Sequence, residues 1–168
     1  IRYARLLPAP AAPSGGPMVI IGYGATNLAT PRSCYAFYDL DRDREQPYRE
    51  LRLADEDVPQ KLIERQAQPS ERTFRGDDFS PVVTILADVF RDPDGAAADE
   101  LVAVFQHRGV THAAICVYRL DATFTLLYRV WVEADIADVY WMAAPRLLAC
   151  AGVNGEALLI ERLVENPP

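Results

Sequence analysis

The segment that decides the predicted fold begins VVTILADVF (Val82–Phe90) and continues through AAADELVAVFQHR (Ala96–Arg108). The first run is apolar and rich in β-branched residues, which is typical of a buried strand. The second run places residues on one face at helical spacing, namely Ala98, Leu101, Phe105 and Arg108. This spacing predicts a helix, and Gly109 directly after it is a stop signal.

Two strands, a second helix and a last strand follow. HAAICVYRL (His112–Leu120) and TFTLLYRVWVE (Thr123–Glu133) are separated only by Asp121 and Ala122, which predicts an antiparallel hairpin. IADVYWMAAPRLLAC (Ile136–Cys150) repeats apolar residues at helical spacing, and ALLIERLV (Ala157–Val164) reads as a strand. The order predicts an α+β fold, a ferredoxin-like βαββαβ module over residues 79–168 with both helices on one face.

Composition narrows the classes of partner and location. The chain has 168 residues, a formal net charge of −7 and 50% hydrophobic residues, and Lys61 is its only lysine. An acidic chain of this kind argues against a nucleic-acid partner, which requires a basic surface. No apolar run reaches the ~20 residues that span a bilayer and no signal peptide is evident, so we expect no membrane partner and a cytoplasmic location. The widely spaced cysteines predict no disulfide framework and no metal site, and we expect no cofactor.

Two further regions precede the predicted module. Residues 1–17 are rich in proline and alanine, as in a tail or linker. Residues 18–78 form an N-terminal extension in which we expect strands at Met18–Ile21 and Cys34–Leu40 and a short helix at Val58–Gln68. We find no internal repeat of solenoid length.

Two motif-like runs in the extension are better explained as loops. The glycines at positions 22 and 24 favour a turn over a dinucleotide loop, because Asn27 stands where the third glycine belongs. Residues 39–50 repeat acids at the spacing of a calcium loop, but Arg44 occupies the position that needs glycine. We therefore expect a solvated loop of alternating charge there.

One face of the predicted sheet lacks a cover. Alternation puts Thr125, Arg129 and Trp131 on one side of the strand Thr123–Glu133 and apolar residues on the other, which would meet the helices. The Arg129 side suits a flat organic ligand or a wet interface. Because an uncovered face bearing Trp131 is a liability for a monomer, we expect a homodimer or burial of this face by residues 18–68.

Four runs resemble one enzyme family. They are ILADVFRDPD (Ile85–Asp94), ELVAVFQH (Glu100–His107), LYRVWVEADI (Leu127–Ile136) and APRL (Ala144–Leu147). They resemble the small aromatic polyketide cyclases of the tetracenomycin F2 type, which with the related antibiotic-biosynthesis monooxygenases are ferredoxin-like dimers forming an α/β barrel. Pro145 matches a proline that divides the second helix of the cyclases, and His107 falls near one of their pocket histidines. Their second pocket histidine has no match here.

The resemblance implies a site. His107 would move protons and Arg129 would stabilise an enolate oxygen, in a pocket lined by Tyr118 and Trp131. Structural alternatives stay open for each: His107 fits a helix C-terminus, Arg129 fits an ion pair with Glu133, and the aromatic side chains fit a core.

Two functions therefore remain. One is a cofactor-independent enzyme of secondary metabolism, a cyclase or monooxygenase-like protein that acts on a small aromatic, polyketide-like molecule by proton transfer. The other is a non-catalytic, dimerising regulatory or assembly module that uses the open sheet face and the N-terminal extension for protein contacts.

Overall fold

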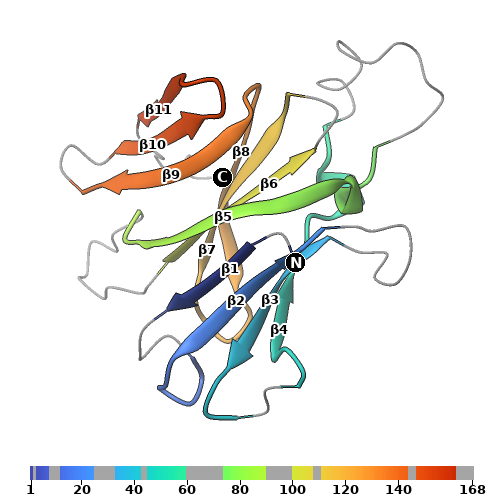
Figure 1. Cartoon of the computed structure of the whole chain (residues 1–168), viewed down its shortest axis with the longest axis vertical. Helices are drawn as coiled ribbons and strands as arrows, with labels where there is room; N and C mark the ends of the chain where they lie inside the picture. The colour runs from blue at the N-terminus through green and yellow to red at the C-terminus, as the bar shows by residue number, and fades with distance from the viewer. Residues whose placement is uncertain are drawn as a thin grey trace. The chain divides into compact units, whose positions relative to one another are not determined.

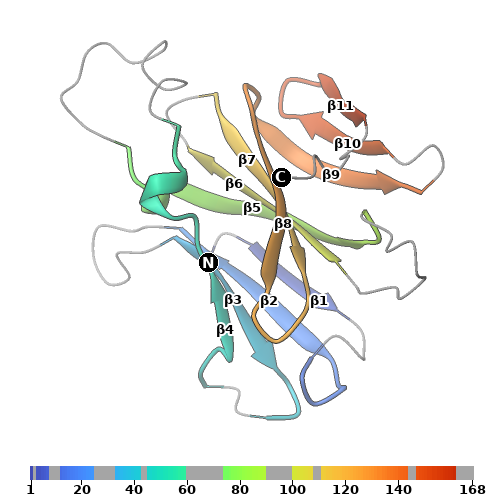
Figure 2. The same ribbon diagram turned by 180° about the vertical axis from the view of Figure 1, so that it is seen from behind.

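The computed structural model describes residues 1, 3–7, 12–24, 33–42, 45–59, 74–89, 100–107, 111–143 and 147–161. In these ranges the chain forms three β-sheets and two short 3₁₀ turns, and it contains no α-helix (Figure 1). Each sheet is a meander, because strands that follow one another in the chain lie next to one another in the sheet (Figure 2).

The first sheet has the order β1-β2-β3-β4, and its printed pairs are antiparallel. Its strands are β1 (Tyr3–Leu7), β2 (Met18–Tyr23), β3 (Cys34–Asp39) and β4 (Arg49–Leu51). Along β2 the buried and half-buried residues alternate, so the period of two that makes a strand also sorts its side chains between two faces. Met18, Ile20, Tyr35 and Phe37 are each 0% exposed and form the core of this sheet. The 3₁₀ turns are η1 (Asp55–Asp57) and η2 (Gly76–Asp78).

The second sheet has the order β5-β6-β7-β8. It comprises β5 (Phe79–Ala87), β6 (Glu100–His107), β7 (Ala113–Arg119) and β8 (Thr125–Val132). The antiparallel hairpin of β7 and β8 has a bulge between Val117 and Tyr118. The predicted hairpin is confirmed, and so is a strand over most of Val82–Phe90.

The third sheet has the order β11-β10-β9 and consists of β9 (Ile136–Met142), β10 (Leu147–Gly152) and β11 (Ala157–Glu161). Both pairs are antiparallel. The chain divides into two compact units, Ile1–Val82 with Phe105–His112, and Val83–Val104 with Ala113–Pro168. The first unit contains the first sheet, and the second contains the third sheet.

The predicted ferredoxin-like α+β fold, and the α/β barrel with it, is wrong. The helix expected at Ala96–Arg108 is strand β6 wherever that range is described. Leu101, Val102, Ala103, Val104 and Phe105 are all 0% exposed. A strand that is buried on both faces reads as a continuous apolar run, and such a run also satisfies helical spacing.

The second predicted helix, Ile136–Cys150, is also wrong, because this range forms β9 and most of β10. Val139 lies opposite Cys150 and Trp141 opposite Leu148, so each strand places alternate residues on one face. Pro145, which the resemblance placed part-way through the second helix, lies outside the described residues, as does the expected helix Val58–Gln68 beyond Pro59. Across the described ranges no helix has the length and apolar character needed to cross a membrane.

Candidate interaction surface

Two of the four residues predicted for a catalytic pocket, Arg129 and Trp131, share one face of β8. They lie opposite Cys116 and Ala114, whereas Tyr118 follows the bulge of the hairpin and lies opposite Leu126. Tyr118 is 6% exposed, and Arg129 and Trp131 are half-buried.

His107 belongs to the first unit, whereas the other three predicted residues belong to the second. Its ring makes edge-on contacts with Phe74 and Phe79, at centroid distances of 5.1 Å and 5.6 Å. These contacts are those of a side chain packed among aromatic rings. A shared pocket for His107 and Arg129 stays a prediction.

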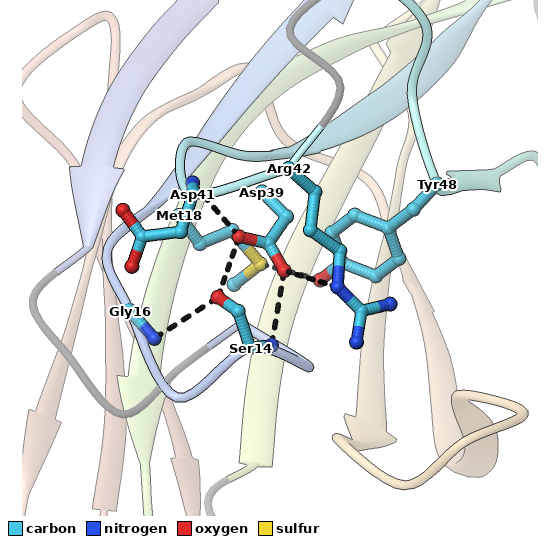
Figure 3. Close-up of polar contacts among 7 residues, drawn as sticks. All are labelled: Ser14, Gly16, Met18, Asp39, Asp41, Arg42 and Tyr48. Carbon is cyan, nitrogen blue, oxygen red and sulfur yellow. Dashed lines mark hydrogen bonds and ion pairs between the residues drawn. The ribbon is translucent and has the colours of Figure 1, made fainter.

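A buried carboxylate that the sequence analysis assigned to a solvated loop joins two turns of the first sheet. Asp39, at the end of β3, is 1% exposed. It accepts hydrogen bonds from the Ser14 hydroxyl at 2.6 Å, the Ser14 backbone N–H at 3.0 Å and the Asp41 backbone N–H at 3.1 Å (Figure 3). Arg42 Nε lies 3.7 Å from its carboxylate.

These contacts explain how a charge is tolerated at a buried position. Burial raises the pKa of the Asp39 carboxyl, but the hydrogen bonds from Ser14 and Asp41 and the charge of Arg42 outweigh burial and hold this pKa below its usual range. The Ser14 hydroxyl also accepts the Gly16 backbone N–H at 3.2 Å. The loop that we expected to be solvated therefore begins with a buried, hydrogen-bonded residue. The carboxylate of Asp39 accepts hydrogen bonds from backbone and hydroxyl groups of the turns, which is a structural role and not that of a catalytic base.

A second aspartate holds the β7–β8 turn in the same manner. The Asp121 carboxylate accepts the Thr123 backbone N–H at 2.9 Å, the Thr123 hydroxyl at 2.8 Å and the Thr125 hydroxyl at 2.7 Å. These bonds lower the pKa of Asp121. Phe124 in the same turn has φ 56°, a left-handed conformation that the fixed turn supports. Both carboxylates are thus used to shape turns.

The third strand of every sheet carries a related sequence that we did not recognise as a repeat. The three runs are CYAFYDL (34–40), AICVYRL (114–120) and ALLIERL (157–163). They coincide with β3, β7 and β11 and their flanking residues, and each ends in leucine. The segments between these runs differ in length, so the sequence shows no constant repeat length. The likeness of the runs becomes visible only when they are aligned on their final leucine.

One face of the third sheet carries exposed apolar residues with an acidic residue on either side. In the register of the sheet, Tyr140, Ala149 and Leu159 form one row across the three strands, Met142, Leu147 and Glu161 form the next row, and Asp138 belongs to the row on the other side. Tyr140 and Leu159 are each 56% exposed, and Met142 is 37% exposed. We call the five apolar residues Tyr140, Met142, Leu147, Ala149 and Leu159 the Tyr140 face.

The side chains at the centre of the opposite face of the same sheet are buried. Val139 and Cys150 are each 1% exposed, and Leu148 is 0% exposed. On the Tyr140 face, a hydrogen bond between the Tyr140 hydroxyl and the Asp138 carboxylate raises the pKa of Tyr140. This bond restrains a large aromatic side chain on the exposed side.

The position of Leu159 is exceptional among the three related strands. When the runs are aligned on their final leucine, Leu159 corresponds to Ala36 in β3 and to Cys116 in β7. Ala36 is 1% exposed and Cys116 is 0% exposed, compared with 56% for Leu159. The third sheet is therefore left open at a position that is covered in its two counterparts.

No protein-family model, curated protein or solved structure matches this chain. The resemblance to polyketide cyclases stays an untested prediction, and the ferredoxin-like fold that it implied is not the fold of the described residues.

Proposed function

We propose that the protein is a non-catalytic assembly module, made of repeated β-meanders, that binds another protein through the Tyr140 face. The observation that carries this proposal is the exposure of Leu159, Tyr140 and Met142 on one sheet face, with Ala149 between Tyr140 and Leu159. Isolated exposed apolar residues are common on protein surfaces, whereas a contiguous apolar patch marks an interaction site.

The repeated architecture supports the proposal. Four-stranded meanders in tandem are the building units of β-propellers, in which each blade packs its faces against other sheets. Leu120 and Leu163 end two of the related runs, and their separation falls within the roughly 40–45 residues of such a blade. This is an analogy of repeat architecture, and the function is argued from the surface itself.

The polar clusters also favour a scaffold. Asp39 and Asp121 use their carboxylates to accept hydrogen bonds from nearby turn residues. Carboxylates whose pKa is lowered by such bonds are poor general bases at neutral pH. Their arrangement serves to fix loops between strands.

Site-specific photocrosslinking tests the proposal. A benzophenone amino acid replaces Tyr140 in the full chain, and the matched control carries it at Ala137, an exposed residue of the same strand. In extract of the organism that encodes the protein, we expect discrete adducts from position 140 that Leu159→Arg abolishes. Equal adduct patterns from positions 140 and 137, or no adducts from either, would refute a binding role for the Tyr140 face.

A further inference from the structure

The third sheet ends at a strand whose counterparts each have a further neighbour. The three related runs make β3, β7 and β11 the third strands of their sheets. β3 also pairs with β4, and β7 with β8, whereas β11 pairs only with β10 in the part of the chain that the structure describes. An edge strand presents unpaired N–H and C=O groups that a further strand can use. The outer side of β11 is therefore a pairing edge at the place where the other two sheets carry their fourth strand.

Side chains on both faces of β11 are more exposed than at the matching positions. On one face Leu158 and Ile160 are half-buried, and on the other Leu159 is 56% exposed. When the runs are aligned on their final leucine, the residues of β3 and β7 that match Leu158 and Ile160 are all 0% exposed, namely Tyr35, Phe37, Ile115 and Val117. The difference is thus not confined to the Tyr140 face.

An unpaired edge explains this pattern better than an uncovered face does. The residues of β10 on the same face as Leu158 are Leu148 and Cys150, which are 0% and 1% exposed, so that face is covered as far as β10. Side chains directly opposite one another on adjacent strands are only about 4.5–5.5 Å apart, so a strand shields its neighbour on both faces. A fourth strand beside β11 would cover Leu158, Leu159 and Ile160 together.

The fourth strands of the other two sheets share a short pattern. Where they pair with the related runs, residues 49–51 of β4 read Arg-Glu-Leu and residues 128–130 of β8 read Tyr-Arg-Val. Both strands put a charged residue opposite the position that Leu159 has in β11, and an aliphatic residue opposite the position of Leu158. The same register predicts a fourth strand that runs antiparallel to β11, with a charged residue followed by an aliphatic one.

The charge of the chain decides the sign of that charged residue. The net charge is −7, and Asp138 and Glu161 belong to the rows on either side of the row of Leu159. A basic residue opposite Leu159 is therefore favoured over an acidic one. Arginine suits the position because its aliphatic stem can pack on Leu159 while its guanidinium stays in water.

We infer that an extended segment of another protein adds to the edge of β11 as an antiparallel fourth strand, with an arginine opposite Leu159 and an aliphatic residue opposite Leu158. This inference rests on the proposed function, because it names how the third sheet holds its partner. Main-chain hydrogen bonds to β11 supply affinity, and the alternate side chains supply specificity. The arginine reaches the Tyr140 face, and the aliphatic side chain covers Leu158 on the opposite face.

Disulfide capture of a synthetic peptide by the full chain tests the inference. The peptide has the sequence of Thr125–Glu133 with a lysine added at each end for solubility, and Arg129→Cys places its thiol opposite residue 159. The protein carries Leu159→Cys, and its own three cysteines are buried. A peptide with Val130→Cys instead is the register control, because alternation turns its thiol to the other face. We expect the first peptide to be captured about tenfold faster or more, since pairing raises the effective concentration of its thiol.

Two further controls separate strand addition from unspecific capture. The chain with Ala137→Cys should show no preference between the peptides, because Ala137 is exposed on β9, the first strand of its sheet, and the first strands β1 and β5 are edges of their own sheets. The cysteine-free peptide should slow capture at residue 159, and its Arg129→Glu variant should slow it less.

Equal capture rates of the two thiol peptides at residue 159, or equal competition by the two cysteine-free peptides, overturn the inference. Without peptide, faster disulfide dimerisation of the Leu159→Cys chain than of the Ala137→Cys chain also overturns it, because that result assigns the edge to a second copy. If position 140 gives adducts with another protein although the peptides show no register preference, the proposed function survives and strand addition does not.

Discussion

Replacement of Tyr35 by phenylalanine tests how a single hydroxyl supports the core of the first unit. Tyr35 is 0% exposed, and its hydroxyl accepts the backbone N–H of Val82 at 2.9 Å. Its ring makes edge-on contacts with Tyr3 and Phe105, at centroid distances of 6.0 Å and 5.1 Å. Tyr35→Phe keeps the ring and removes only the hydroxyl.

The magnitude follows from the group that loses its partner. A buried N–H without an acceptor costs about 1–3 kcal/mol, and Val82 is half-buried, so we expect about 1 kcal/mol. Tyr35→Leu also removes the two ring contacts and leaves a cavity, for a total of about 3 kcal/mol. In a chain of this size 1 kcal/mol lowers the melting temperature by about 2–4 °C, so the two variants should differ clearly.

Thermal and urea unfolding followed by circular dichroism measure these changes. Tyr140→Phe is the control, because it removes the hydroxyl of an exposed residue and only a surface hydrogen bond to Asp138, so it should change the melting temperature much less than Tyr35→Phe. A Tyr35→Phe variant as stable as the parent chain would show that the Val82 N–H does not depend on this hydroxyl. Equal losses for Tyr35→Phe and Tyr35→Leu would show that the ring contacts contribute nothing.

Three further outcomes are expected. Gly76→Ala should destabilise the chain by about 2 kcal/mol or more, since a Cβ there would lie 1.9 Å from the Leu53 carbonyl oxygen; urea unfolding at parental stability would contradict the clash. The folded pKa of Asp39 is lowered, so its stabilisation is present above the unfolded value of 3.8 and lost as pH falls below it; Asp39→Asn should reduce this acid dependence, and an identical pH profile would disprove it. Burial raises the pKa of Cys150 to about 11, so this thiol should resist a thiol reagent at pH 8 until urea unfolds the chain, and rapid labelling of the native protein would be inconsistent with its burial.

The sequence determined the elements whose signals are local. The run CYAFYDL and the β7–β8 hairpin were predictable, because alternation and a very short connection leave few other structures. The related runs that end in Leu40, Leu120 and Leu163 were also present in the sequence. We did not recognise the likeness of these runs from the sequence, because each run is only seven residues long and the distances between them along the chain differ.

Tertiary structure alone decided between helix and strand for Glu100–His107 and for Ile136–Cys150. Both ranges carry apolar residues at positions that fit either structure, and a strand becomes stable only when distant strands supply its hydrogen bonds and cover its faces. Val104 and Cys150 are buried by such long-range packing.

The sequence also could not predict that one face of the third sheet is exposed. Leu159 belongs to the same apolar pattern as the buried Ala36 and Cys116, and no local signal distinguishes them. The sequence thus determined which segments favour strands and which residues are apolar. The pairing of β9 with β10 and of β10 with β11 decided which apolar residues face solvent, because exposure depends on what covers a sheet and not on the residues within it.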